Sequence, residues 1–166
     1  DLGQTMPFDL FYQKMAQGAD TKTSQVNAEE YEEYFEGFLK DGKDVTIIAS
    51  GIMLDEALRA EEILSAEGIS ARVIDMHTWK PIDEELICKA ASETGLLVTV
   101  EEHSIIGGLG GAVAEAVTSC CPVPVVRIGV NDEFGHSGPA IDLLKEFGLC
   151  AENIAAVTKK ALAEKK

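Results

Sequence analysis

The sequence predicts an α/β fold built on a mostly parallel sheet. From Asp44 onward, short runs of β-branched residues alternate with longer amphipathic runs, which is the order of βα units around such a sheet. Hydrophobic residues make up 46% of the 166 residues, enough for a substantial core in one globular domain. Aromatic residues contribute only 6%, whereas there are 15 glycines. This balance favours aliphatic strands and helices joined by glycine turns over a β-sandwich.

Four strands are predicted from short apolar runs rich in β-branched residues. They cover residues 45–49, 71–76, 96–100 and 123–130. The third run is continuously apolar, as expected for a strand covered by helices on both faces, so it is predicted to be central. The fourth carries Pro124 near its start, where a missing N–H is tolerated best in an edge strand.

The predicted helices follow these strands and are bounded by recognisable signals. They cover residues 54–67, 84–92, 107–121, 139–147 and 151–164. Gly68 is a C-cap signal for the first helix, and Asp83 is the predicted N-cap of the second, which ends before Gly95. Small residues in the third favour close packing on the sheet, and Pro122 ends it.

The N-terminal part differs in kind from the rest. Residues 1–30 are predicted to be an irregular extension or the remnant of a fragment, and residues 31–166 the α/β domain. Within 27–40 the sequence allows either an acidic helix capped by Asn27 or a short antiparallel edge strand at 35–39. Because the first residue is Asp rather than Met, we expect a processed piece or a fragment.

Charge and composition exclude several partners. The 29 acidic and 14 basic residues give a formal net charge of −15, which repels nucleic acid and anionic membrane surfaces. No run approaches the roughly 20 apolar residues of a membrane span, and no leader is visible. The four cysteines form no CxxC pair, so reduced thiols and a cytoplasmic location are expected.

Ligands of open α/β sheets bind beyond the carboxyl ends of the strands. All three histidines are predicted there: His77, His103 and His136. Their spacing carries no metal-ligand signature, and histidines that cap helices or orient loops are far commoner, so no metal site is predicted. In the run Glu101-Glu102-His103, a carboxylate beside an imidazole can prepare it for proton transfer, or the side chains can simply fix the loop. Both interpretations stay open.

Glycines at 107–111 follow a strand and open a helix. A dinucleotide site with Asp132 as the ribose acid fits poorly, because Val113 stands where the third glycine of the fingerprint belongs. A tight turn with close packing of helix on sheet is favoured instead, while the N–H groups at this helix start remain a candidate anion site. The sequence has neither a Gly-x-Ser-x-Gly elbow nor a Walker loop, which excludes hydrolase and kinase hypotheses.

Three motifs together resemble a known family. They are DVTIIASG at 44–51, EEHS at 101–104 followed by GGLG at 107–110, and FGHSG at 134–138. Over about residues 41–162 the chain resembles the C-terminal domain of thiamine-diphosphate-dependent enzymes of the transketolase family, most closely the C-terminal section of split bacterial transketolases. The resemblance implies a three-layer α/β/α domain with a mixed sheet of about five strands, one of them antiparallel near residues 34–39.

The resemblance also implies a parent transferase of the pentose phosphate pathway, which moves a two-carbon ketol group between sugar phosphates. Thiamine diphosphate and a divalent metal, Mg²⁺, are implied for that parent enzyme. The family holds them elsewhere, through a Gly-Asp-Gly motif that this sequence lacks. We therefore expect this chain alone to be inactive, with no catalytic, cofactor-binding or metal-binding residue.

The expected roles are assembly and bordering the active site. The partners implied are the other transketolase domains or an N-terminal subunit, within a homodimer. Candidate interface residues are Glu102, His103, Ser104, Gly107, Gly108, Phe134, His136 and Ser137. Two alternatives remain: a stand-alone module that binds a small anion or a partner protein, and the same domain of a 1-deoxyxylulose-5-phosphate synthase or a 2-oxoacid dehydrogenase E1 β subunit. The Glu102-His103-Ser104 run favours transketolase.

Overall fold

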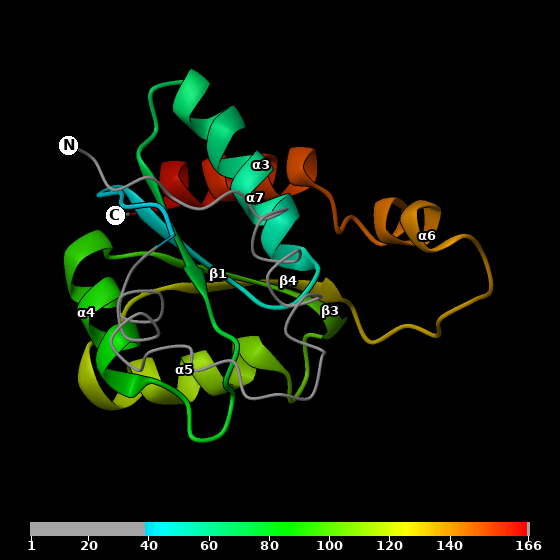
Figure 1. Ribbon diagram of the computed structural model, residues 1–166. Coiled ribbons are helices and arrows are strands. Elements are labelled where there is room, and N and C mark those ends of the chain that lie inside the picture. Colours follow the sequence, from blue (N-terminus) through cyan, green and yellow to red (C-terminus); the bar gives the residue numbers. More distant parts are fainter. Residues whose placement is uncertain (1–38, 166) are drawn as a thin grey trace, which may run out of the picture. The chain divides into compact units, whose positions relative to one another are not determined.

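Four parallel strands form the central sheet in a computed structural model that describes residues 39–165. They are β1 (Val45–Ala49), β2 (Ala71–Asp75), β3 (Leu97–Ser104) and β4 (Val125–Val130), arranged in the order β2-β1-β3-β4 (Figure 1). The α/β fold class is therefore confirmed. The prediction that the third strand is interior and the fourth lies at an edge is also confirmed.

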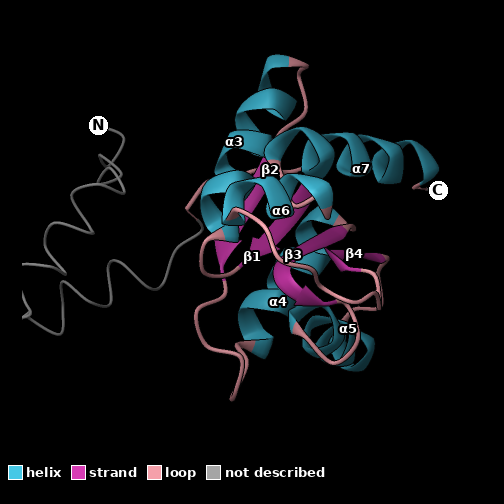
Figure 2. Cartoon of the chain, turned by 90° about the vertical axis from the view of Figure 1, so that its right-hand side faces the viewer, coloured by secondary structure: helices cyan, strands magenta, loops and turns pink. Residues whose placement is uncertain are grey.

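Helices cover both faces of the sheet. They are α3 (Met53–Ala66), α4 (Glu84–Thr94), α5 (Leu109–Cys120), α6 (Ala140–Glu146) and α7 (Ala151–Glu164). Figure 2 shows α3 and α7 on one side of the strands and α4 and α5 on the other. Each face buries its own apolar cluster, one shared by α3 and α7 and one by α4 and α5. The result is the three-layer architecture that the family resemblance implies.

The interior strands are apolar because both of their faces are covered. In β1, Val45, Ile47 and Ala49 belong to the cluster under α3 and α7, whereas Ile48 belongs to the cluster under α4 and α5. All four are fully buried. Burial of each aliphatic side chain of this size contributes about 1.5–3 kcal/mol, so the strand sequence itself requires helices on both sides.

The helix boundaries follow their capping residues. The Asp83 side chain accepts a hydrogen bond from the Leu86 N–H at 2.9 Å, which confirms the predicted N-cap of α4. The helix ends at Gly95, whose φ of 64° is left-handed. For α7 the capping carboxylate comes from another helix, because the Glu56 side chain of α3 accepts the Ala151 N–H at 2.7 Å. This bond ties α7 to α3 across the same face of the sheet.

Two expectations need correction. Strand β3 extends to Ser104 instead of ending at residue 100, so Glu101, Glu102 and His103 are strand residues, with an irregularity in the pairing with β4 between Val100 and Ser104. Cys88 and Cys120 form a disulfide, so the expectation of four reduced thiols is wrong for this pair. Their Cα atoms lie 6.0 Å apart, a separation that a disulfide requires and that sequence spacing does not reveal.

The predictions for the N-terminal part fall mostly outside the described residues. These are the extension at 1–30, the acidic helix from Asn27 and the edge strand near 34–39. At the start of the described range, Lys40 forms an isolated antiparallel bridge with Val73 of β2. The antiparallel direction agrees with the expected fifth strand.

No helix within residues 39–165 is long and apolar enough to cross a membrane.

Candidate functional site at the carboxyl edge of the sheet

Exposed apolar side chains concentrate beyond the carboxyl ends of the strands. Five large hydrophobic residues in the described part of the chain are exposed: Ile52 (51%), Trp79 (38%), Ile106 (61%), Phe134 (98%) and Ile141 (68%). Each lies after the end of a different strand, except Phe134 and Ile141, which both follow β4. We call these five residues the carboxyl-edge surface. They all follow the carboxyl ends of strands, where open α/β sheets bind their ligands, and this makes that edge the candidate site.

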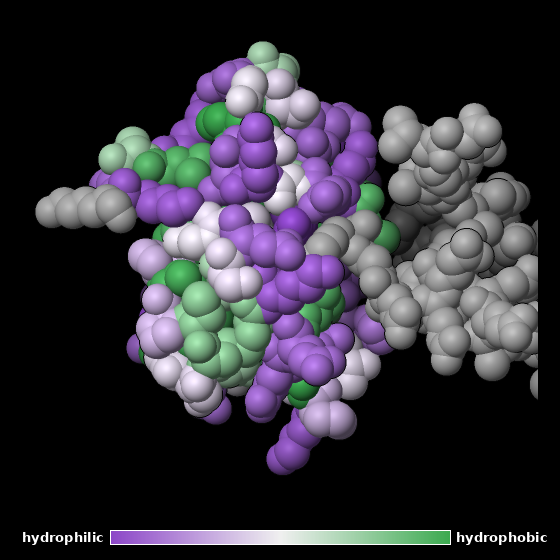
Figure 3. All heavy atoms as spheres, turned by 90° about the vertical axis from the view of Figure 1, so that its left-hand side faces the viewer, coloured by the Kyte–Doolittle hydropathy of each residue, from purple (hydrophilic) through white to green (hydrophobic). Residues whose placement is uncertain are grey.

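The segment after β4 contributes most to this exposure. Every residue from 131 to 142 is exposed, and α6 contains no fully buried residue. We call residues 131–147 the arm. Figure 1 shows it standing away from the sheet and the other helices. The opposite side of the molecule, seen in Figure 3, carries hydrophilic side chains over much of its described surface, with apolar patches between them.

His136 organises the arm internally. Its Nε2 lies 2.8 Å from Glu146 Oε2, and its ring centroid is 5.4 Å from that of Phe147. These contacts connect the loop to the end of α6. Phe134 and Ser137, on either side, are exposed. Leu144 and Phe147 pack against the core and anchor the arm, whereas Phe134 and Ile141 are exposed.

The Glu101 carboxylate lies at the N-terminus of α5, where the sequence suggested a site for an external anion. Its side chain is buried, with 1% exposure. Oε2 accepts the Leu109 N–H at 2.7 Å and Oε1 accepts the Gly110 N–H at 2.9 Å, both at the N-terminus of α5. A carboxylate is favoured there because helix N-termini carry partial positive charge. The predicted anion site at this helix start is thus wrong for these N–H groups, since the chain supplies its own anion.

Glycine at position 108 is explained by the same carboxylate. A Cβ at Gly108 would overlap Glu101 Oε2 and lie 2.9 Å from the Ser104 carbonyl oxygen. The backbone here is extended, with φ of −98°, so the requirement is for space rather than for an unusual dihedral angle. Gly107, in contrast, has a φ of +75°, in the left-handed region that glycine adopts most easily. The favoured interpretation of these glycines, a tight turn with close packing, is confirmed.

The remaining candidates from β3 face outward. Glu102 and His103 are exposed, and Ser104 is half-buried. His103 Nδ1 lies 3.1 Å from the Ser104 carbonyl oxygen, and Ser104 Oγ accepts the Ile106 N–H at 3.2 Å. Of the acid-acid-His run, Glu101 fixes the structure, while Glu102 and His103 are available at the surface. A role for them in proton transfer stays a prediction.

The described residues do not fit a metal or a diphosphate group. No set of three or more His, Cys, Asp or Glu side chains within 39–165 is arranged to hold a metal ion. His77, His103 and His136 are therefore not assembled into one metal site. The two N–H groups of α5 that would face a diphosphate are already bound to Glu101.

Asp75 is an ionisable group at this edge that sequence reasoning did not single out. It ends β2 and is half-buried, and desolvation raises the pKa of its carboxyl group above 3.8, although the nearby His77 acts in the opposite direction. The available signal was an acid at the carboxyl end of a predicted strand that also contains Arg72. Burial therefore disfavours the charged form of this carboxyl group relative to the unfolded chain.

Replacing Asp75 with asparagine is expected to stabilise the fold at pH 7. The folded pKa is raised, so the folded state binds more protons than the unfolded state, and the carboxylate opposes folding increasingly as the pH rises from 3.8 through the folded pKa. The increase in the free energy of unfolding that Asp75→Asn gives should thus become smaller as the pH falls toward 3.8. Urea denaturation at a series of pH values measures it. Glu62→Gln, on an exposed position of α3, controls for loss of one charge, and an equal benefit from both variants would contradict the burial effect.

Comparison with known proteins gives a consistent result. A family model described as "Transketolase, C-terminal domain" matches residues 37–154. A putative transketolase C-terminal section from Methanocaldococcus jannaschii is 57% identical over 118 residues, which cover 70% of this chain and 36% of that protein. A 6-deoxy-6-sulfo-D-fructose transketolase subunit from a Clostridium species is 47% identical over 127 residues (76% and 39%). A 1-deoxy-D-xylulose-5-phosphate synthase from Heliobacterium modesticaldum is 44% identical over 126 residues (74% and 19%).

Solved structures give the same match at the level of the fold. A structure titled "Split gene transketolase, inactive beta4 tetramer" superimposes with a TM-score of 0.75 at 55% identity, and covers 78% of this chain and 43% of that one. A transketolase variant from Pichia stipitis has a TM-score of 0.56 at 24% identity, covers 76% of this chain and 18% of that one, and supports the fold alone. The chain spans between a fifth and two fifths of the length of the curated relatives it matches.

Proposed function

The chain belongs to the family of transketolase C-terminal domains, and from this premise we propose that it is the C-terminal part of a transketolase that assembles through its carboxyl edge. The parent enzyme transfers a two-carbon ketol group between sugar phosphates, in the pentose phosphate pathway and in the cytoplasm. The domain itself supplies no catalytic group. Its work is to hold the assembly together and to border the active site.

The observation that carries this proposal is the apolar exposure at the carboxyl edge. A domain that functioned alone would leave Phe134 at 98% exposure and Ile141 at 68% in water. Covering apolar area stabilises association by about 25 cal/mol per Å², and interface anchors are often aromatic. The arm therefore has the properties of a segment completed by a partner.

The proposed partners are the cofactor-binding domains of the same enzyme and a second copy of the assembly. Thiamine diphosphate and Mg²⁺ are proposed to be held by those other domains. The structure that is 55% identical to this chain is described as a tetramer of β chains, which supports self-association of such sections. Glu102, His103, Ser104 and Gly107 are close in sequence to the carboxyl-edge residue Ile106, in the segment proposed to border the active site.

A second candidate keeps the domain and changes the parent enzyme. Similarity to a 1-deoxy-D-xylulose-5-phosphate synthase at 44% identity supports that alternative. The E1 β subunit of a 2-oxoacid dehydrogenase remains the other expectation of this kind. The stand-alone anion-binding module loses its supporting observation, because Glu101 binds the N–H groups that it requires. Combining the chain with its cofactor-binding section and assaying ketol transfer separates these enzymes: formation of 1-deoxyxylulose 5-phosphate instead would favour the synthase.

Adding a charge to the arm is expected to break the assembly without unfolding the domain. Phe134→Asp and Ile141→Asp should each weaken association with the cofactor-binding section by at least about 30-fold, the effect of losing an interface anchor. Ketol transfer should fall in parallel at low subunit concentration. The thermal midpoint of the chain alone should hardly change, since both side chains are largely exposed. Sedimentation velocity of the mixed sections measures the association.

Ala163→Asp is the matched control. It adds the same charge at an exposed position near the end of α7, in a helix outside the carboxyl-edge surface. Unchanged association for the control and loss for both arm variants would support the proposal. If Phe134→Asp and Ile141→Asp assemble as tightly as Ala163→Asp does, the carboxyl edge is not the interface.

A further inference from the structure

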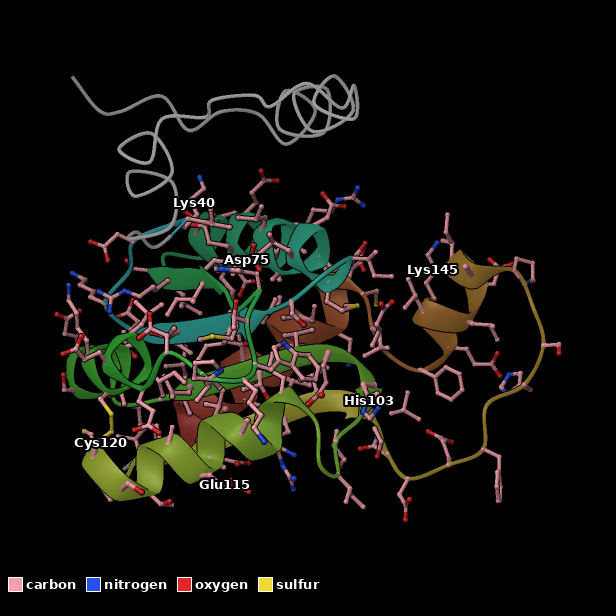
Figure 4. The ribbon with its side chains drawn as sticks, turned by 60° about the horizontal axis from the view of Figure 1, so that its bottom comes forward. Lys40, Asp75, His103, Glu115, Cys120 and Lys145 are labelled. Atoms are coloured by element: carbon pink, nitrogen blue, oxygen red, sulfur yellow. A yellow bond between two sulfur atoms is a disulfide. The ribbon has the colours of Figure 1, made fainter. Side chains whose placement is uncertain are left out.

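A disulfide joins two helices on the same face of the sheet. It links Cys88 of α4 to Cys120, the last residue of α5. Cys88 is half-buried and Cys120 is exposed, so a small thiol reaches the bond from solvent. Figure 4 shows the bond at the end of α5 remote from His103. The other two cysteines, Cys121 and Cys150, are free and provide internal controls.

A groove of about 400 Å³ lies between the same two parts of the structure. One wall comes from the loop before α4 and the first residue of α4: Trp79, Lys80, Ile82 and Glu84. The other is one side of α5: Ala112, Glu115, Ala116 and Ser119. Glu84 lies one helical turn before Cys88, and Ser119 directly precedes Cys120. The disulfide therefore connects the two walls of the groove.

The contact between α4 and α5 combines long and short side chains. Their shared apolar cluster contains Ile87, Ala90 and Ala91 from α4 and Leu109, Val113, Ala116 and Val117 from α5. The alanines and valines contribute few atom pairs each. The disulfide adds a covalent constraint to this packing, at the groove.

We propose that Cys88 and Cys120 form a reversible redox clamp that sets the spacing of α4 and α5, and with it the shape of the groove between them. In the cytoplasmic location proposed above for the parent enzyme the bond would be reversible, since disulfides in reducing compartments are usually transient or redox-sensing. Trp79 belongs to both the groove and the carboxyl-edge surface. The two proposals are still tested apart, because the clamp depends on the cysteines of α4 and α5 and the assembly on Phe134 and Ile141 of the arm.

The exchange requires only low-molecular-weight thiols and their disulfides. The thiolate of R–SH attacks Sγ of Cys120, the S–S bond breaks, and Cys88 leaves as a thiolate that takes up the proton lost by R–SH. A second R–SH attacks the mixed disulfide on Cys120 and forms R–S–S–R, which releases the Cys120 thiol. Two thiols are oxidised for each protein disulfide reduced, and R–S–S–R drives the reverse reaction.

Trp79 makes the clamp measurable, because it is the sole tryptophan and lines the groove. Thiol titration of the chain should find two reactive cysteines before reduction and four after it. Reduction with dithiothreitol at 25 °C should change the emission of Trp79 and increase its quenching by acrylamide. Oxidised glutathione should reverse both changes. The thermal midpoint should drop by roughly 10 °C on reduction.

Matched variants separate a switch from a purely structural bond. Cys88→Ser and Cys120→Ser should show the reduced signal at all times and ignore dithiothreitol, whereas Cys121→Ser should respond as the wild type does. Reduction of the wild type gives the same information if either variant folds poorly. A lower thermal midpoint with unchanged Trp79 emission and quenching would overturn the switch, as would four reactive thiols in the chain equilibrated with oxidised glutathione.

Discussion

Replacing Glu101 with alanine should lower the free energy of unfolding by about 3–5 kcal/mol. The variant removes two hydrogen bonds to a charged group, each worth about 1.5–3 kcal/mol, and leaves the buried N–H groups of Leu109 and Gly110 without their acceptor. It also removes the negative charge from the N-terminus of α5. Urea denaturation followed by circular dichroism measures the loss.

Glu101→Gln tests the charge separately from the shape. Its amide keeps the size of the carboxylate but presents one oxygen and one NH₂ group, so only one of the two N–H groups of α5 retains an acceptor. The free energy of unfolding of Glu101→Gln should lie between those of the wild type and Glu101→Ala. The control is Glu102→Ala, at the adjacent exposed position, with an expected change within about 0.5 kcal/mol. Equal costs at positions 101 and 102 would show that the buried carboxylate contributes nothing.

Two glycines in α5 and its N-cap should respond to alanine with opposite signs. Gly108→Ala should destabilise the fold by about 1–3 kcal/mol, because its Cβ would overlap the Glu101 carboxylate, which is fixed by its own hydrogen bonds. Gly111→Ala should stabilise by about 0.5–1 kcal/mol, since a Cβ there meets nothing within 4 Å and alanine is the better helix former.

Each of these variants serves as the other's control, because both make the same chemical change three residues apart. Thermal denaturation and urea midpoints of the two proteins give the signs directly. The double variant Glu101→Ala/Gly108→Ala adds a further check. Removing the carboxylate makes room for the Cβ, so Gly108→Ala should lower the free energy of unfolding by less in the Glu101→Ala protein than in the wild type. If Gly108→Ala and Gly111→Ala both stabilise or both destabilise the fold, the space available for a Cβ near the start of α5 does not determine the change in stability.

Much of the fold was predictable because each element carries its signals locally. The apolar run Val45–Ala49 matches β1, and the amphipathic run Ala151–Glu164 matches α7. Asp83 is followed by helical periodicity and does cap α4. Where a residue's neighbours in sequence determine its environment, the sequence suffices.

The contacts at the candidate site and at the disulfide were harder to predict. They join residues that are far apart in the sequence, or they involve backbone groups that are the same in nearly every residue. Glu101 binds backbone N–H groups, which every residue except proline carries, so no pattern distinguishes it from the exposed Glu102. Because Glu101, Glu102 and His103 are polar, the sequence pattern did not indicate that β3 continues through them. Cys88 and Cys120 become neighbours only after two helices pack on one face, 32 positions apart.

The arm also bears on how long an unassembled copy survives. Exposed loops of small and polar residues are the preferred places at which proteases cut folded chains, and residues 131–139, apart from Phe134, form such a loop before α6. A copy made in excess of its partners would present this cleavage site continuously. A copy whose arm is covered would not. Degradation of the surplus would then keep the sections of the enzyme in balanced numbers without any dedicated regulator.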